Sequence, residues 1–488
     1  MNHQITLSQN IWRGAFVLVT LLLLGALMGA CSSEPEVVVQ TVVETVEVQV
    51  TVAPEVITET VIETVVETVV ETVVEEVQVA VTATPAPPPD FSGVALEGIM
   101  RNSFIPSMNT LQANQAEVWA AQTGGFADLT FSREWREQVA AAVDSGAGGD
   151  LSELFANQAF IYGDQLLDVS DIAEELAAQY GGWYELAAEA SVVDGVWRAI
   201  PRAYTAQAIN YRTDIFEQAG ITKVPETYEE LLAAAKAIHE AGLPPAGFTM
   251  NQAGPNDSAN FAYSLLWSYG GAEVAEDGCT VTINSPETRA ALEYMIELAQ
   301  YMAPDVTAYD EGGNNRAFLA GEISMTQNAT SILWTARQQA PDIAANMNHF
   351  KYPAGPAGRQ EFVQMNLLAI PAHTDNPEAA KHFLRWIMQP EQLGPLAQEG
   401  LTFYTPLLHY YDDQPNMPWN TDPALEPLKG AADGGHLAGW PGPASRESAA
   451  AYENQTIVNM FASVLNGTPV EDAVSMAEEE LNTVYKCN

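Results

Sequence analysis

The stretch AQAINYRTDIFEQAGITKVPETYEELLAAAKAIHEAG, residues 206–242, carries the local signals that decide the fold of this 488-residue chain. The apolar run 206–211 favours a β-strand. Thr227 followed by Glu230 forms a capping box, which predicts a helix that starts there and ends at Gly242. A strand followed by a capped helix is the unit from which α/β proteins are built.

The same alternation continues on both sides of this stretch. Further helices are predicted after Ser285-Pro286, Asn376-Pro377 and Thr468-Pro469, because proline is favoured at the first position of a helix. Short apolar or alternating runs between the helices predict strands. These runs are residues 94–100, 128–131, 151–155, 206–211, 323–326 and 362–370. The pattern predicts an α/β fold with largely parallel sheets, and the length of the chain favours two lobes.

The N-terminus reads as a secretion signal. Arg13 precedes the apolar run 15–27, and Gly29 and Ala30 stand just before Cys31. This predicts a signal peptide over residues 1–30, too short for a comfortable membrane span. The pattern resembles the lipobox of bacterial lipoproteins, which implies that Cys31 becomes a lipid-modified N-terminus. The protein is then expected at the cell membrane, lipid-anchored and facing outside the cytoplasm, in the periplasm or at the cell surface.

Residues 31–90 form a low-complexity segment of Val, Thr, Glu, Ala and Pro. Glutamate recurs at every fourth position from Glu55 to Glu75, so the valine pairs form no fixed apolar face on a helix. Two interpretations stay open at this point. The segment is either a solvated stalk or a region of self-association through its valine-rich repeats.

Charge and cysteine content exclude several classes of protein. The chain has 63 acidic and 19 basic residues, a formal net charge of −44, which makes a nucleic-acid surface improbable. Cys279 and Cys487 could form a disulfide outside the cytoplasm, although the sequence does not show their distance. No paired Cys or His spacing suggests a bound metal.

The short motifs of enzymes are missing from the sequence. It has no Gly-x-Ser-x-Gly elbow, no His-Glu-x-x-His helix and no phosphate-cradling glycine loop. We therefore expect a protein that is not an enzyme and needs no cofactor. A glycosidase needs only two suitably placed carboxylates, so a surface glycosidase remains a minor alternative.

Residues 91–488 resemble the extracellular solute-binding proteins of the carbohydrate ABC importer family, similar to maltose- and multiple-sugar-binding proteins. The resemblance rests on three blocks in the family's order. They are WRAIP (197–201) with INYRTDIFEQAGI (209–221) and VPETYEEL (224–231), AFLAGEISM (317–325), and AIPA (369–372) with NPEAAKHFL (376–384).

The resemblance implies a two-lobed periplasmic-binding-protein-like fold of class II, with discontinuous lobes, a hinge and a ligand cleft between them. Lobe 1 is expected at about 91–202 plus 325–368, and lobe 2 at about 203–324 plus 369–488. The implied function is capture of a sugar or oligosaccharide by a monomer and its delivery to the transmembrane subunits of an ABC permease. The same fold carrying another solute, such as a polyamine, is the alternative.

A sugar cleft needs aromatic platforms and side chains that form hydrogen bonds in fixed directions. The aromatic candidates follow predicted strands, lie near lobe crossings or stand in loops, and each has a buried core position as its alternative. They are Tyr204, Trp267, Tyr269, Trp334 and Trp440. The polar candidates are Asn157, Gln158, Asn314, Arg316, Asn328 and Asn366, with Arg101 and Asn102 as weaker ones at the end of the first strand.

Overall fold

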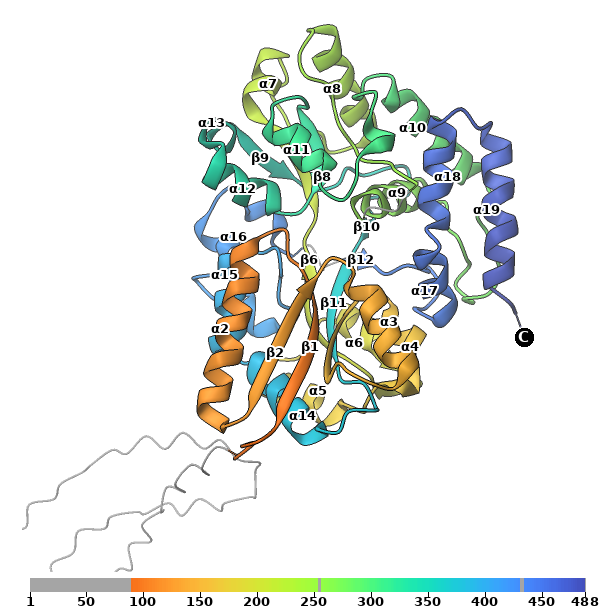
Figure 1. The fold of residues 1–488 in the computed structure, drawn as a ribbon. Helices are drawn as coiled ribbons and strands as arrows, with labels where there is room; N and C mark the ends of the chain where they lie inside the picture. The colour runs from red at the N-terminus through yellow and green to blue at the C-terminus, as the bar shows by residue number, and fades with distance from the viewer. Residues whose placement is uncertain (1–88, 253–255, 431–433, 488) are drawn as a thin grey trace, which may run out of the picture. The chain divides into compact units, whose positions relative to one another are not determined.

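A computed structural model describes residues 89–252, 256–430 and 434–487 of the chain (Figure 1). The chain divides into two units, Met1–Pro87 and Pro88–Asn488, and the description below concerns the second. The predicted signal peptide, Cys31 and the stalk up to Pro88 lie outside the described residues. No helix in the described part of the chain is both long and apolar enough to cross a membrane.

The first sheet has five strands and is only partly parallel. β1 lies parallel to β2 and β3, whereas β11 runs antiparallel to β3 and to β6. The strand order is β2 (Phe126–Ser132), β1 (Ala95–Arg101), β3 (Leu151–Phe155), β11 (Gln364–Ala369) and β6 (Ile200–Thr205). Within this sheet, the prediction of largely parallel strands therefore holds only for β2, β1 and β3.

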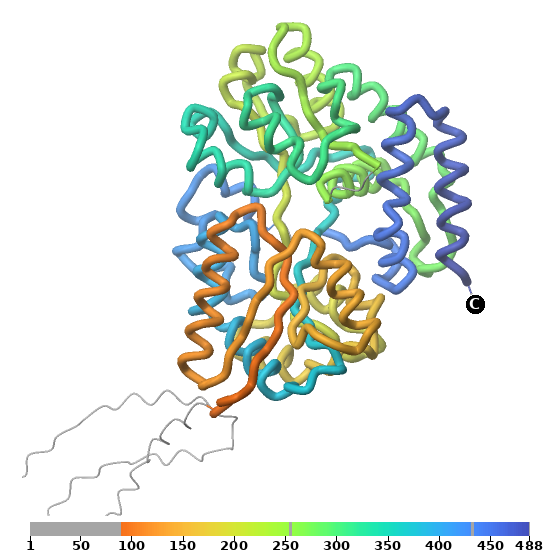
Figure 2. The backbone as a smooth tube through the Cα atoms, viewed as in Figure 1, coloured from red at the N-terminus to blue at the C-terminus, as the bar shows by residue number. Residues whose placement is uncertain are grey.

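The second sheet has three antiparallel strands in the order β8 (Met325–Asn328), β7 (Ala208–Arg212) and β9 (Met347–Phe350). Only Ala206 and Gln207 separate β6 from β7, so the chain runs directly from one sheet into the other (Figure 2). Within the second sheet the strands alternate in direction, although helices separate β7 from β8 and β8 from β9 along the chain.

The strand pairing groups the chain differently from the predicted lobe boundaries. β8 and β9 pair with β7, so residues 325–350 belong with the second sheet, where the sequence placed them in lobe 1. Conversely, α14 (Pro377–Ile387) and α15 (Pro390–Glu399) pack on helices of the first sheet. The physical reason is that strand register and helix packing assign a segment to a lobe, and neither is written in its local sequence.

Helices cover both faces of the first sheet (Figure 1). On one face α14 and α15 pack against α2 (Pro106–Thr123), and α14 also contacts α5 (Ser170–Gln179). Helix α14 buries Phe383, Leu384 and Ile387 in this layer. The other face is contacted by α3 (Trp135–Ser145), α4 (Gln158–Tyr162) and α6 (Glu185–Ser191).

The second sheet is contacted by α7, α9 and α11, and α18 and α19 pack side by side next to α9 and α10 (Figure 1). The helices beyond the first sheet are α7 (Thr213–Gln218), α8 (Tyr228–Glu240), α9 (Asn256–Tyr269), α10 (Pro286–Ala299), α11 (Gly313–Leu319), α12 (Ser331–Gln339), α13 (Pro341–Ala345), α16 (Pro418–Thr421), α17 (Arg446–Glu453), α18 (Thr456–Leu465) and α19 (Val470–Val484). Two further pairs of short strands lie outside these sheets. β4 (Val192–Val193) is antiparallel to β5 (Val196–Trp197), and β10 (Glu361–Phe362) is parallel to β12 (Gly435–His436). Four 3₁₀ turns occur at Gly163–Gln165, Val306–Ala308, His409–Tyr411 and Glu426–Leu428.

The predicted capping box is present at the start of α8. The Thr227 hydroxyl oxygen accepts a hydrogen bond from the Glu230 amide at 3.2 Å, and the Glu230 carboxylate accepts one from the Thr227 amide at 3.3 Å. Beyond the helix, Gly242 has φ +67°, a conformation that favours glycine. These local signals fixed both ends of α8 because each acts within a few residues.

A buried ion pair lies inside the first lobe. Arg202 on β6 places Nη2 3.1 Å from the Glu153 carboxylate on β3, and both side chains are 1% exposed. Arg202 Nη1 donates a hydrogen bond to Gln112 at 2.6 Å, and the Tyr404 hydroxyl donates one to Glu153 at 2.7 Å. The Arg101 backbone amide donates a further hydrogen bond to Glu153 at 3.2 Å. The network joins strands β1, β3 and β6 to helix α2 and to the 400–405 segment.

Candidate ligand-binding site

Strand ends from both sheets meet where the chain passes between them. The register places Gln364, at the start of β11, beside Thr205, at the end of β6. It also places Asn328, at the end of β8, beside Ala208, at the start of β7. Arg101, the last residue of β1, lines the same small cavity as Thr205, Asn328 and Gln364. Side chains from the two sheets therefore face each other here. We call this place, where the ends of β1, β6 and β8 and the starts of β7 and β11 meet, the crossing.

Two neighbouring cavities occupy the crossing. The smaller has a volume of about 10 Å³, room for roughly one water molecule. The larger has a volume of about 150 Å³. Arg101, Phe104, Asn256 and Glu311 line both. The smaller is otherwise lined by Thr205, Gln207, Asp257, Asn315, Asn328, Ala329, Ser331, Gln364 and Phe403, and the larger by Asn102, Arg133, Trp135, Arg136 and Glu137.

Asp257 near the start of α9 holds three amide side chains at the smaller cavity. Its carboxylate accepts hydrogen bonds from Asn328 at 2.8 Å, Asn314 at 3.0 Å and Gln207 at 3.3 Å. Burial raises the pKa of Asp257 to about 7, with the nearby Glu311 charge acting in the same direction. The amide donors oppose this rise because they stabilise the carboxylate. Asp257 thus orients amides from three separate segments around one point.

Asn256 ties the two sheets together beside Asp257. Its side-chain oxygen accepts a hydrogen bond from Arg136 Nη2 of α3 at 3.0 Å, and its backbone oxygen accepts one from Gln364 of β11 at 2.9 Å. Its backbone amide donates to the Glu311 carboxylate at 3.0 Å. These contacts cross from the first sheet and its helices to α9, so they hold the crossing closed in this structure.

Guanidinium groups and aromatic rings alternate in the wall of the larger cavity. The guanidinium carbon of Arg101 lies 5.1 Å from the Phe155 ring centroid and 5.5 Å from that of Trp135. That of Arg136 lies 4.9 and 5.0 Å from the same two rings. Arg133 lies 5.6 Å from the Phe104 ring. Such a wall can contact an apolar ligand face and offer hydrogen-bond donors at its edge.

Several polar atoms of residues that line the two cavities have no hydrogen-bond partner among the described residues. They include Arg101 Nη1, Trp135 Nε1 and Gln207 Oε1. Arg101 is 5% exposed and Trp135 7% exposed. A buried polar atom without a partner is costly, because its hydration is lost and nothing replaces it. The two cavities are therefore lined by polar groups that no described residue engages.

Three of the residues predicted from the sequence come together at this crossing. Asn314 and Asn328 meet at the Asp257 carboxylate, and Asn328 also lines the smaller cavity. Asn366 donates its side-chain N–H to the Thr205 hydroxyl at 2.9 Å, one layer behind the cavity wall. Their role as ligand contacts stays a prediction.

Three predicted aromatic residues lie in packed clusters instead. Trp267 is fully buried, with its ring centroid 5.6 Å from that of Trp440. Trp440 stacks on His436 with 4.1 Å between ring centroids. Tyr269, at the end of α9, packs against Tyr228 and Tyr294. None of the three lines either cavity of the crossing.

Asn157 and Gln158 form structural hydrogen bonds behind β3. Asn157 Nδ2 donates to the Ala438 carbonyl at 2.9 Å, and Gln158 Oε1 accepts from the Phe155 amide at 2.9 Å. Gln158 Nε2 also donates to Glu453 at 3.1 Å. The structure thus places both amides in contacts between helices α4 and α17 rather than at the crossing.

The remaining predicted residues are dispersed. Tyr204 lines a separate cavity of about 350 Å³ together with Trp419. Arg316 is exposed and forms an ion pair with Asp310 at 2.7 Å. Trp334 of α12 is partly buried against the apolar core of the first lobe. Sequence position after a strand was the basis for most of these predictions, and it does not fix which way a side chain points.

Fifteen of the eighteen residues that line the two cavities were not among the predicted candidates, and Arg101 and Asn102 were only weaker ones. Trp135 and Arg136 come soon after the predicted strand 128–131, so the rule that selected Asn157 could have selected them too. Asp257 and Glu311 follow no predicted strand and have no local signal. The missed residues are Phe104, Arg133, Trp135, Arg136, Glu137, Thr205, Gln207, Asn256, Asp257, Glu311, Asn315, Ala329, Ser331, Gln364 and Phe403.

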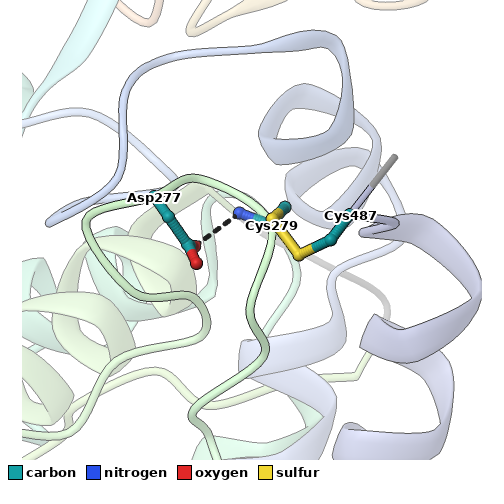
Figure 3. A group of neighbouring side chains, drawn as sticks. All are labelled: Asp277, Cys279 and Cys487. Carbon is teal, nitrogen blue, oxygen red and sulfur yellow. Dashed lines mark hydrogen bonds between the residues drawn. A yellow bond between two sulfur atoms is a disulfide. The ribbon is translucent and has the colours of Figure 1, made fainter.

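Cys279 and Cys487 form a disulfide that ties the C-terminal segment to the loop before α10 (Figure 3). Asp277 lies beside them, and its carboxylate accepts a hydrogen bond from the Cys279 amide at 2.9 Å. These three residues are the one grouping in the described part of the chain with metal-ligand spacing. Because disulfide sulfurs are not thiolates, they are not available as metal ligands.

Comparison with known proteins identifies the class. The family model for bacterial extracellular solute-binding proteins matches residues 108–427. The chain therefore belongs to the bacterial extracellular solute-binding protein family, which consists of binding components rather than enzymes. The resemblance found in the sequence is confirmed.

Curated relatives are distant. A probable ABC transporter-binding protein of Deinococcus radiodurans is 24% identical over 283 residues, 56% of this chain and 67% of that protein. A diacetylchitobiose-binding protein of Streptomyces coelicolor is 26% identical over 241 residues, 48% of this chain and 54% of that protein. A putative binding protein of Brucella abortus is 27% identical over 213 residues, 43% of this chain and 51% of that protein. The match thus spans about half the length of the last two relatives.

Solved structures share the fold. The maltose-bound MalE3 of T. maritima has a TM-score of 0.70 at 21% identity, covering 80% of this chain and 99% of that one. A sugar transporter from Arthrobacter chlorophenolicus with bound laminaribiose has a TM-score of 0.69 at 19% identity, covering 81% and 100%. The predicted two-lobed α/β binding-protein fold is confirmed.

Proposed function

We propose that this protein is the lipid-anchored substrate-binding component of an ABC importer that captures a sugar or oligosaccharide outside the cytoplasm. The observation that carries the proposal is the crossing between the two sheets. There amides held by Asp257 face aromatic rings and open guanidinium donors. Sugars present hydroxyl groups at their rims and apolar C–H faces, which this combination matches.

The size of the cavities supports a closing cleft. A sugar does not fit in about 10 Å³, so the lobes must separate for a ligand to enter. The direct passage from β6 to β7 through Ala206 and Gln207 is a short segment that can act as a hinge. The contacts of Asn256 across the crossing would break on opening and re-form around the ligand. A permease that recognises the closed form then receives only loaded protein.

The relatives support a carbohydrate as the solute class. Two of the similar structures hold bound maltose and bound laminaribiose, respectively. The Streptomyces relative is named for diacetylchitobiose. A polyamine, the alternative solute, would meet the guanidinium groups of Arg101, Arg133 and Arg136 and also the carboxylates of Glu137 and Glu311 in the larger cavity, so the melting experiment below decides between the two solute classes.

Ligand-induced stabilisation tests the solute class. The full-length chain, purified in detergent, is melted against neutral oligosaccharides, acidic saccharides and polyamines. A ligand that binds only the native state raises Tm by mass action. We expect a rise with at least one saccharide and none with spermidine. A rise with spermidine and with no saccharide would contradict the sugar assignment and keep the binding-protein fold.

The anchor is tested separately in cells. We expect metabolic labelling with a fatty acid to mark the wild type, and Cys31→Ser to abolish the label and release the protein from the membrane fraction. Equal labelling of Cys31→Ser would contradict the anchor at this residue. The outcome is independent of which solute the cleft binds.

A further inference from the structure

The basic residues of the globular unit are distributed unevenly. Residues 91–488 carry 18 Lys and Arg against 51 Asp and Glu. Three of those 18, Arg101, Arg133 and Arg136, line the single 150 Å³ cavity of the crossing. Glu137 and Glu311 line the same cavity, so the three guanidinium groups give its lining a formal charge of +1, against −33 for residues 91–488.

Two of these arginines lack ionic partners. Among the ion pairs formed by described residues, none includes Arg101 or Arg133, and the one of Arg136 is long, 3.9 Å to Glu453. Other arginines of the chain, such as Arg289 and Arg385, contact carboxylates at 2.9 Å or less. A buried guanidinium without a carboxylate is unusual, because removing a charge from water is expensive unless another charge compensates it.

The acids nearest to the cavity are already engaged. Asp257 accepts hydrogen bonds from three amides, and Glu311 accepts one from the Asn256 backbone amide. Glu137 lines the cavity with its side chain exposed to solvent. Asp257 is close enough to Arg101 for the two charges to act on each other. Neither Asp257 nor Glu311 forms an ion pair with Arg101, whose Nη1 stays unpaired.

A second unpartnered donor belongs to another residue that lines the same cavity. Trp135 Nε1 is buried and has no hydrogen-bond partner among the described residues. Trp135 and Arg101 both line the 150 Å³ cavity, and the Arg101 guanidinium lies 5.5 Å from the Trp135 ring. Two donors beside one cavity, neither with an acceptor, form a site for a group that offers several acceptor oxygens.

We infer that the cleft binds an acidic saccharide whose carboxylate or sulfate group sits against Arg101 and Trp135, with Arg133 at the rim. The inference rests on the proposed sugar-binding function and narrows it. An oxygen-bearing anion accepts from the Arg101 fork and from Trp135 Nε1, and the sugar ring packs on the ring of Phe104, which lines both cavities. The amides held by Asp257 remain free to bind hydroxyl groups at the other end of the cleft.

Matched pairs of saccharides test the inference by titration calorimetry on the full-length chain in detergent. The pairs are digalacturonate with its neutral methyl ester, and a sulfated disaccharide with its desulfated form; maltotriose is the neutral reference and spermidine the cationic one. We expect one acidic member to bind at least tenfold more tightly than its neutral counterpart, with affinity falling as salt rises. Which pair responds distinguishes carboxylate from sulfate.

Other outcomes separate the inference from the proposed function. Equal or tighter binding of a neutral member, or of maltotriose alone, overturns the acidic ligand and keeps the sugar-binding function. Binding of spermidine alone overturns both. Binding of no member overturns the inference as well.

Three variants locate the acidic group. We expect Arg101→Gln to weaken the acidic ligand by roughly tenfold to a hundredfold, the range typical of a charged hydrogen bond. Arg133→Gln, at an exposed position that does not threaten folding, is expected to weaken it less and to reduce the salt dependence. Arg289→Gln removes the same charge far from the crossing and serves as the control. An unchanged acidic-to-neutral affinity ratio in both Arg101→Gln and Arg133→Gln would overturn the proposal.

Discussion

Two buried arginines on the first sheet have different partners. Arg202 on β6 is 1% exposed and meets the Glu153 carboxylate, Gln112 and the Tyr404 ring. Arg101 at the end of β1 is 5% exposed, contacts aromatic rings and leaves Nη1 unpaired. The guanidinium charge of Arg202 thus faces a carboxylate inside the lobe, although its Nε and Nη2 atoms have no hydrogen-bond partner among the described residues, whereas Arg101 has no ion pair at the crossing. The difference separates a structural charge from a charge available to a ligand.

Glu153 connects the two arginines. Its carboxylate lies 3.1 Å from Arg202 Nη2 and accepts the Arg101 backbone amide at 3.2 Å. The Arg101 backbone is thereby fixed by the core network while its guanidinium faces the cavity. Such support from behind keeps a binding group in place without occupying its donors.

The largest effect on stability is expected for the buried Arg202–Glu153 pair. Glu153→Gln leaves the Arg202 guanidinium buried without a counter-charge, and breaking a buried pair in this way costs about 3–5 kcal/mol of unfolding free energy. Urea denaturation of the full-length chain measures it. A loss below about 1 kcal/mol would show that the pair contributes no more than a surface contact.

A pH dependence of intermediate size is expected at the crossing. The pKa of Asp257 is raised by burial to about 7, and those of Glu273 and Glu361 are raised to about 7 for the same reason. Between pH 6.5 and 8 the native state therefore binds protons that the unfolded state has already lost, so the unfolding free energy falls as pH rises. Each group contributes at most about 1.4 kcal/mol per pH unit.

The variant Asp257→Asn separates the contribution of Asp257 to the pH dependence from those of Glu273 and Glu361. We expect a shallower fall of the unfolding free energy between pH 6.5 and 8, measured by urea titration at each pH. Below pH 6.5 the neutral imidazoles of His349 and His436 oppose this fall, because burial lowers the pKa of each to about 4 and these side chains take up protons on unfolding. A slope unchanged by Asp257→Asn would show that its carboxylate is already ionised at pH 6.5.

A smaller effect on stability is expected from the cleft arginine. Arg101→Met removes an unpaired buried charge, which favours folding, and loses contacts with the rings of Trp135 and Phe155, which opposes it. We expect a net change within about 1.5 kcal/mol in either direction. Arg202→Met, which leaves Glu153 unpaired, is the matched variant and should cost at least twice as much. Equal losses of unfolding free energy in the two variants would show that Arg101 and Arg202 contribute to stability in the same way.

The smallest effect is expected at the surface. Glu471 is exposed and pairs with Arg289 at 2.7 Å, between α19 and α10. Exposed pairs contribute about 0.2–1 kcal/mol, so Glu471→Gln should lower the unfolding free energy by no more than that. High salt should abolish the difference from wild type. A larger loss would show that this pair, unlike most exposed pairs, is held in a rigid geometry.

Much of the fold could be read from short stretches of sequence. The strand 151–155 and the capped helix α8 have the predicted positions, and α14 begins at Pro377 as expected. Strands β6 and β9 were missed, and the boundary at residue 325 grouped β8 with the wrong sheet. Local propensity indicates that a segment is a strand but not which strand it pairs with, because pairing depends on residues far along the chain.

The site could be predicted only in part. Asn314 and Asn328 reach the Asp257 carboxylate, whereas Trp267 turned out to be packed in the core. Position after a strand selected candidates of both kinds. Asp257 and Glu311 had no signal of their own, since what makes them part of the site is the approach of two sheets.

The sequence by itself determined the class of protein, because the family blocks, the capping box and the strand-helix alternation are each encoded within a few dozen residues. It also determined the excess of acidic over basic residues, which makes three arginines at one cavity notable. Only the tertiary structure decided that Arg101, Trp135 and Asp257 share one crossing and that Cys279 and Cys487, 208 residues apart, form a disulfide. The physical reason is that contacts across a crossing depend on strand register and on the direct passage from β6 to β7.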